Sequence, residues 1–117
     1  MFSEQKSWNE AQNDCQRVSS NLVTISSISV NTFVKEMVKT SGVDNPWIGG
    51  YLVSATNQDF GWIDGSPFSY ENWDRDQPIY NDAEKCVEIV NGKLHDFNCS
   101  FQRAFVCSKA ASKGNLR

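Results

Sequence analysis

An acidic stretch between residues 71 and 85 holds the side chains best suited to chemistry in this chain. Its carboxylates belong to Glu71, Asp74, Asp76, Asp82 and Glu84. Only Arg75 and Lys85 carry the opposite charge there. Carboxylates this close together repel one another unless water or a cation lies between them, and calcium takes about six to eight oxygen ligands from such loops. The stretch is therefore either a calcium-binding loop or a solvated acidic loop.

Enzymatic chemistry has little support in the sequence. His95 is the only histidine, and a nucleophilic triad or a histidine-rich metal centre needs partners that do not cluster around it. We therefore expect no catalytic residues and no enzyme activity. The formal net charge of −3 argues against a nucleic-acid partner. No apolar run in the sequence reaches the length of a membrane span.

The cysteines predict the compartment of the protein. There are four, without a Cys-x-x-Cys pair or a cysteine–histidine cluster, so zinc binding is disfavoured. An even count in a chain of this size predicts two disulfides rather than reduced cytosolic cysteines. Of the three possible pairings we favour Cys86–Cys99, which closes a local segment, together with Cys15–Cys107. We expect an extracellular or secreted domain that belongs to a longer precursor.

Two helices are predicted before residue 43. The first begins at a capping box formed by Ser7 and Glu10. Its inward face is expected to carry Trp8, Ala11, Cys15 and Val18. The second has Ser29 as its expected N-cap and ends at Gly42. Its apolar face consists of Val30, Phe33, Val34, Met37 and Val38.

Short antiparallel strands follow the helices, which predicts an α+β fold. The strands are expected at residues 47–51, 60–63, 87–90, 93–96 and 104–107. Asn91-Gly92 predicts a tight hairpin turn with positive φ at both residues. Residues 66–85 form a long stretch without periodicity, and loops of that length in a compact domain are usually functional. We expect one domain over residues 1–108 and a polar tail or linker remnant over 109–117.

Several motifs in the right order resemble those of C-type lectin-like domains. Trp8, Glu10, Ala11 and Cys15 resemble the first helix of that family, and Trp47-Ile48-Gly49 resembles its central strand. Residues 62–67 and 70–73 resemble the approach to its ligand loop, and Cys86, Cys99 and Cys107 match its terminal cysteine spacing. The resemblance covers residues 2–108. It implies a short form of the C-type lectin-like fold, with two helices packed on short antiparallel sheets, a long ligand-binding loop and the same two disulfides.

The resemblance also implies a ligand set. Sugar-binding members hold calcium with a Glu-Pro-Asn or Gln-Pro-Asp triplet, a following glutamate and a Trp-Asn-Asp triplet. This chain has Gln77-Pro78-Ile79, then Glu84, then Leu94-His95-Asp96. The metal ligands carried over are Gln77, Glu84, His95 and Asp96. Because Ile79 offers no side-chain oxygen and imidazole favours softer cations, we expect calcium binding to be weak, at millimolar concentrations.

Two functions follow from the loop. The first is carbohydrate recognition in a secreted lectin with a weak, degenerate calcium site, and the alternative is a calcium-independent domain that binds a protein partner. The expected ligand-binding residues are Gln77, Ile79, Tyr80, Glu84 and Asp96. An Ile79-Tyr80 pair at the loop apex suits a protein contact, because aromatic residues are enriched at interface centres. Binding to ice or a mineral surface on the same scaffold has no dedicated sequence support.

Overall fold

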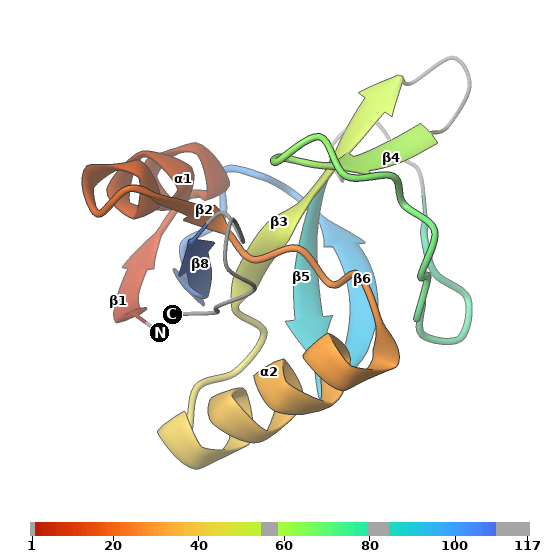
Figure 1. Ribbon diagram of the computed structural model, residues 1–117, viewed down its shortest axis with the longest axis horizontal. Helices are drawn as coiled ribbons and strands as arrows, with labels where there is room; N and C mark the ends of the chain where they lie inside the picture. Colours follow the sequence, from red (N-terminus) through yellow and green to blue (C-terminus); the bar gives the residue numbers. More distant parts are fainter. Residues whose placement is uncertain (1, 55–58, 80–84, 110–117) are drawn as a thin grey trace.

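The computed structural model describes residues 2–54, 59–79 and 85–109. Its elements follow the chain in the order β1 (Phe2–Lys6), α1 (Trp8–Arg17), β2 (Ser20–Leu22), α2 (Ile28–Ser41), β3 (Trp47–Ser54), β4 (Asp59–Trp62), β5 (Cys86–Val90), β6 (Lys93–Phe97), β7 (Arg103–Phe105) and β8 (Cys107–Lys109). Figure 1 shows the two helices on either side of the strands. The predicted α+β fold is confirmed.

A mixed sheet forms the centre of the molecule. Its strand order is β1-β7-β3-β5-β6, with β4 paired to β3, and a second sheet consists of β2 and β8. All pairs are antiparallel except β3 with β7. The hairpin between β5 and β6 turns at Asn91 and Gly92, whose φ values of 50° and 79° confirm the predicted turn.

The helices agree with the sequence prediction at most positions. The capping box of α1 is present, and α2 ends at Gly42 in the left-handed conformation. The N-cap of α2 is Ser27 and not Ser29, because the Ser27 hydroxyl accepts the hydrogen bond from the Val30 N–H at 3.2 Å. Val18 and Phe33 were wrongly assigned to the buried faces. They are 50% and 53% exposed, since Val18 is the C-cap of α1 and Phe33 lies at the solvent edge of α2.

Strands β1 and β2 were not predicted from the sequence, and a single strand was predicted where β7 and β8 are separate. β1 reads FSEQK and β2 reads SNL, so neither has an apolar alternation long enough to recognise. Both strands are defined by their partners, because β1 pairs with β7 and β2 pairs with β8. The break between β7 and β8 at Val106 lets these neighbouring segments join different sheets.

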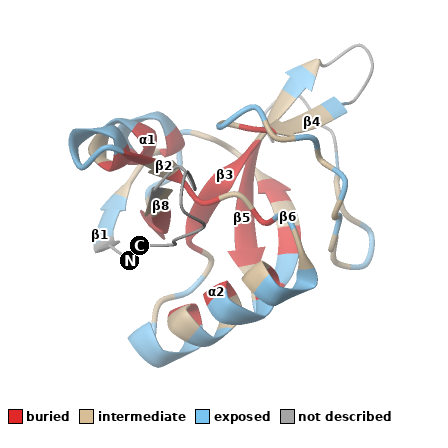
Figure 2. Cartoon of the chain, in the orientation of Figure 1, coloured by how far each residue is buried: buried red, intermediate tan, exposed pale blue. Residues whose placement is uncertain are grey.

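Two apolar clusters give the scaffold its stability. One includes Val34 and Val38 of α2 together with buried residues of β5 and β6, and the other surrounds Trp47 and includes Trp8 of α1. Figure 2 shows the buried residues along the central strands and on the inward sides of the helices. The Trp47 indole is fully buried and donates to the Lys6 and Phe101 carbonyls at 3.1 and 3.2 Å. The polar end of this side chain is therefore satisfied inside the core.

Both predicted disulfides are present. Cys15–Cys107 joins α1 to β8, and Cys86–Cys99 joins the start of β5 to the segment after β6, with Cα–Cα distances of 5.6 and 5.2 Å. The first bond spans a sequence separation of 92 residues and the second spans 13. The expected tail boundary stays a prediction. β8 extends to Lys109, and residues 110–117 lie outside the described part of the chain.

Candidate functional site

Aromatic rings anchor the segment that leads from β4 into the long loop. Phe68 stacks between Trp62 and Trp73, with ring centroids 4.6 and 5.7 Å apart, and Phe60 meets Trp73 edge-on at 5.0 Å. Trp62 is 2% exposed, and Trp73 packs half-buried against the same cluster. These aromatic residues hold the segment against the scaffold, which is a packing role.

The loop then runs beside β6. The Leu94 N–H donates to the Asn72 carbonyl at 2.9 Å, and the Asp74 N–H donates to the Leu94 carbonyl at 3.1 Å. Trp73 forms a parallel bridge with Leu94. These backbone bonds place residues 74–79 next to the side chains that β6 presents at His95 and Asp96.

The structure brings Gln77, Ile79 and Asp96 together, and hydrogen bonds join these three residues to one another. Asp96 Oδ1 accepts the Ile79 N–H at 2.9 Å, and Gln77 Oε1 accepts the Asp96 N–H at 3.2 Å. Asp96 is only 2% exposed. The Gln77–Pro78 peptide bond is cis. Asp96 Oδ1 and Gln77 Oε1, which belong to predicted metal ligands, therefore hold the loop to β6 through hydrogen bonds.

His95 pairs with a residue that sequence reasoning did not assign to the site. His95 Nε2 lies 2.8 Å from Asp74 Oδ2. The hydrogen bond with His95, followed by the one from the Arg75 N–H, lowers the pKa of the Asp74 carboxyl below its usual value of 3.8. Asp74 belongs to the acidic stretch, but nothing in its spacing distinguished it from Asp76. Its partner is set by the register of the loop on β6.

The remaining predicted site residues, Tyr80 and Glu84, lie outside the described residues, as does Asp82. Glu71 accepts the Trp73 indole N–H at 3.2 Å, and Asp76 is exposed. The acidic stretch is thus not one cluster in the described chain. Within residues 2–54, 59–79 and 85–109, no group of three or more His, Cys, Asp or Glu side chains is arranged to hold a metal ion.

The donor set fits calcium poorly among the residues that the structure describes, which do not include Glu84. Calcium needs several oxygens that converge on one point. Here the Ile79 side chain has none, and the His95 imidazole contacts Asp74. One side-chain oxygen each of Gln77 and Asp96 accepts a hydrogen bond from a backbone N–H group. What faces solvent is an apolar side chain with polar neighbours, since Ile79 is 51% exposed. We call the residues Asp74, Gln77, Ile79 and His95 the loop surface.

The fold and the two disulfides define a C-type lectin-like domain. The chain matches the model of the Lectin C-type domain over residues 4–109, and it belongs to this family. Members are non-enzymatic recognition modules, in agreement with the expectation of no enzyme activity. In the part of the chain that the structure describes, no helix has the length and apolar character to cross a membrane.

The relatives of known sequence are larger proteins. The human versican core protein is 32% identical over 113 residues, which is 92% of this chain and 3% of versican. Ladderlectin of Oncorhynchus mykiss is 32% identical over 100 residues, which is 80% of this chain and 52% of ladderlectin. The chain therefore spans a small part of the first protein and about half of the second.

Solved structures of related domains superpose well. Human lithostathine gives a TM-score of 0.82 at 28% identity, covering 91% of this chain and 78% of that one. The herring type II antifreeze protein gives a TM-score of 0.80 at 28% identity, covering 91% of this chain and 84% of that one. The carbohydrate-recognition domain of the mouse scavenger receptor C-type lectin gives a TM-score of 0.76 at 31% identity, covering 91% of this chain and 85% of that one. The same scaffold is thus found in proteins with different names.

Proposed function

We propose that this chain is an extracellular recognition module that binds a protein partner at the loop surface and needs no cation to shape that surface. The compartment is supported by the two disulfides, which persist in oxidising environments. The observation that carries the proposal is the hydrogen bond between the Ile79 N–H and Asp96 Oδ1. It fastens the loop apex to β6 with the carboxylate that a calcium site would use.

The composition of the loop surface favours a protein partner. Ile79 is half exposed, and the polar residues Asp74, Gln77 and His95 belong to the same loop and to the strand beside it. An apolar residue inside a polar rim is typical of interface centres. Because the hydrogen bonds to β6 already order the backbone here, binding costs little conformational entropy.

A second candidate is weak, calcium-dependent carbohydrate recognition. Gln77 and Asp96, two residues of the galactose-type ligand set, lie in contact through the Asp96 N–H. A domain named for carbohydrate recognition, that of the mouse scavenger receptor C-type lectin, is 31% identical. The cow CD23 domain, solved in the presence of the oligosaccharide GlcNAc2Man3, is 29% identical with a TM-score of 0.76. In this candidate a cation would have to displace the bonds that Gln77 and Asp96 make.

The two candidates separate on arrays of glycans and of extracellular proteins, each probed in calcium and in EDTA. The proposal predicts protein hits that persist in EDTA and are lost with Ile79→Asp. The matched control is Phe33→Asp, which places the same charge on an equally exposed apolar residue of α2 and should leave the hits unchanged. Glycan hits that disappear in EDTA would instead support the second candidate and contradict the proposal.

A further inference from the structure

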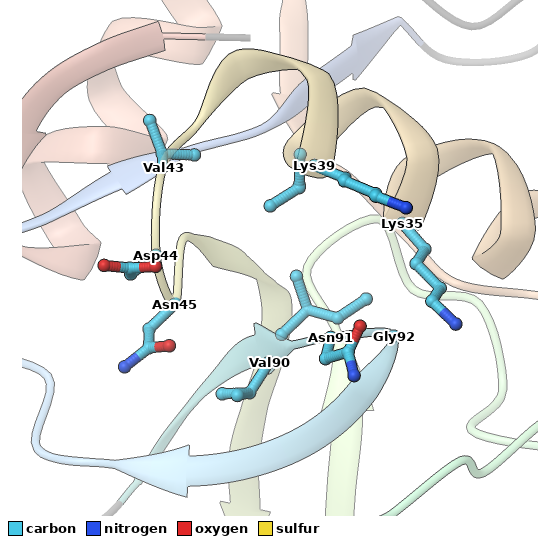
Figure 3. A pocket seen from close by; sticks show the side chains of 10 residues that line it. Lys35, Lys39, Val43, Asp44, Asn45, Val90, Asn91 and Gly92 are labelled. Carbon is cyan, nitrogen blue, oxygen red and sulfur yellow. The ribbon is translucent and has the colours of Figure 1, made fainter.

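A groove lies between α2 and the β5–β6 hairpin, and it shares no residue with the loop surface. Its volume is about 220 Å³. Figure 3 shows Lys35 and Lys39 extending from α2 along one side, while Asp44 and Asn45 of the connection to β3 lie on the other. Val90 and the hairpin turn close the groove between these two sides. The two sides thus differ in charge.

The floor of the groove is aliphatic. Ile89 and Val38 are 1% and 9% exposed, and Val43 and Val90 are half-buried. None of the described residues that line the groove is aromatic. Branched aliphatic side chains at the base of a small hollow suit one aliphatic side chain of a ligand, because burying it removes apolar surface on both partners from water.

The edge formed by the hairpin turn is fixed in position. The Gly92 carbonyl accepts hydrogen bonds from the side-chain amides of Asn31 at 3.1 Å and Asn72 at 2.5 Å. The Lys35 stem packs closely on this glycine, since a Cβ at position 92 would lie 2.8 Å from Lys35 Cδ. The groove is therefore formed before any ligand arrives, which lowers the entropic cost of binding.

The α2 edge carries positive charge without a described partner. Lys35 and Lys39 are four residues apart and so lie on the same face of the helix. Neither is in an ion pair with a carboxylate that the structure describes. On a chain with a net charge of −3, this edge is a local site of attraction for anions.

We propose that the groove binds an acidic peptide segment of a partner protein. An aliphatic side chain of that segment would lie against the half-buried Val43 and Val90. A neighbouring carboxylate would lie against Lys35 and Lys39. The volume is below the range of about 300–1,000 Å³ that is usual for small-molecule sites, but it accommodates one side chain. Asp44 on the opposite side repels a ligand that carries negative charge along its whole length, such as a sulfated saccharide. A peptide can turn its carboxylates toward Lys35 and Lys39 and donate backbone N–H groups to Asp44.

The test is an NMR titration of the ¹⁵N-labelled chain with the blocked tripeptide acetyl-Asp-Leu-Glu-amide. We expect saturable shifts of the backbone amides of residues 35–45 and 89–92. Two comparison peptides with the same blocked ends separate the contributions of charge and of apolar contact to binding. The sequence Asn-Leu-Gln removes the charge, and Asp-Gly-Glu removes the aliphatic side chain. Both should bind about tenfold more weakly, which corresponds to about 1.4 kcal/mol. A sulfated heparin disaccharide is the competing probe.

The protein variant for this test is Lys35→Gln/Lys39→Gln, and its matched control is Arg17→Gln/Lys85→Gln, which removes two charges from exposed positions outside the groove. The proposal predicts that only the first pair abolishes the shifts, with thermal unfolding of both variants confirming that they fold. It is overturned if the tripeptide gives no saturable shifts, if both double variants respond alike, or if the sulfated disaccharide binds the groove in preference to the peptide.

Discussion

The scaffold around Trp47 and the loop surface around Ile79 differ most in what holds them in place. Trp47 is fully buried among apolar side chains, and the Cys15–Cys107 disulfide lies in the same cluster. Ile79 is half exposed, and hydrogen bonds to β6 keep its backbone in position. Apolar burial scales with the area removed from water, whereas one such hydrogen bond contributes about 0.5–1.5 kcal/mol. Substitutions in the loop can therefore alter its side chains while the core keeps the scaffold folded.

The largest difference between the two regions concerns the disulfides. Cys15→Ala/Cys107→Ala should lower the free energy of unfolding by about 4–5 kcal/mol, because the bond closes a long loop in the unfolded chain. The Cys86–Cys99 bond closes a short loop, so Cys86→Ala/Cys99→Ala should lower the free energy of unfolding by about 3 kcal/mol. Urea denaturation of both variants measures which of the two loses more free energy of unfolding. If the short-loop pair costs more, the scaffold does not depend mainly on the long cross-link.

Matched tryptophan substitutions compare the regions directly. Trp47→Phe should cost about 2–4 kcal/mol, because it leaves a cavity in the core and leaves the Lys6 and Phe101 carbonyls without their donor. Trp73→Phe should cost about 0.5–1.5 kcal/mol, since that indole is half-buried and donates to the exposed Glu71 carboxylate. Equal losses in urea denaturation would show that the loop anchor is as important as the core.

The Asp96 carboxylate that accepts the Ile79 N–H can be removed by substitution. Asp96→Ala should cost about 1–3 kcal/mol, because the Ile79 N–H loses its acceptor. Hydrogen exchange of the Ile79 amide should accelerate, while exchange in β3 and β5 changes little. Glu36→Ala removes an exposed carboxylate of α2 and serves as the control. Unchanged exchange at Ile79 in Asp96→Ala would mean that this bond does not hold the loop.

The smallest expected effect is the pH dependence of the Asp74–His95 contact. The pKa of Asp74 is lowered in the folded chain, so the carboxylate contributes stability at pH values above its usual value of 3.8. That contribution is lost as the pH falls through the lowered pKa. Thermal midpoints measured between pH 6 and pH 2 should therefore decline less steeply in Asp74→Asn and in His95→Phe than in the unaltered chain. Identical acid profiles for all three would contradict the contact.

The scaffold could be predicted from the sequence because its signals are local and repeated. The capping box at Ser7, the turn at Asn91-Gly92 and the cysteine spacing each need only a short segment to be recognised, and all three agree with the structure. The strands β1 and β2 were missed because pairing partners distant in the sequence define them. The second helix was placed correctly, but its N-cap depends on which serine hydroxyl reaches the Val30 N–H.

The loop surface was predicted only in part. Motif positions indicated Gln77, Ile79, His95 and Asp96, and the structure places these residues near one another. Their bonding partners could not be predicted, because the contacts of Asp74 with His95 and of Asp96 with the Ile79 backbone depend on the register of an irregular segment on β6. The groove residues Lys35 and Lys39 gave no signal beyond two ordinary helix positions.

The most direct test of the central claim is the thermal midpoint of the chain in about 10 mM calcium and in EDTA. A site with a dissociation constant of about 1 mM would add about 1.4 kcal/mol of stability at that concentration, and the midpoint would rise by about 4 °C or more. Ile79→Asp/His95→Asn restores two family ligands and should gain calcium stabilisation, which makes it the positive control. The account predicts equal midpoints for the unaltered chain in both buffers. A midpoint that rises with calcium and falls with EDTA would contradict it.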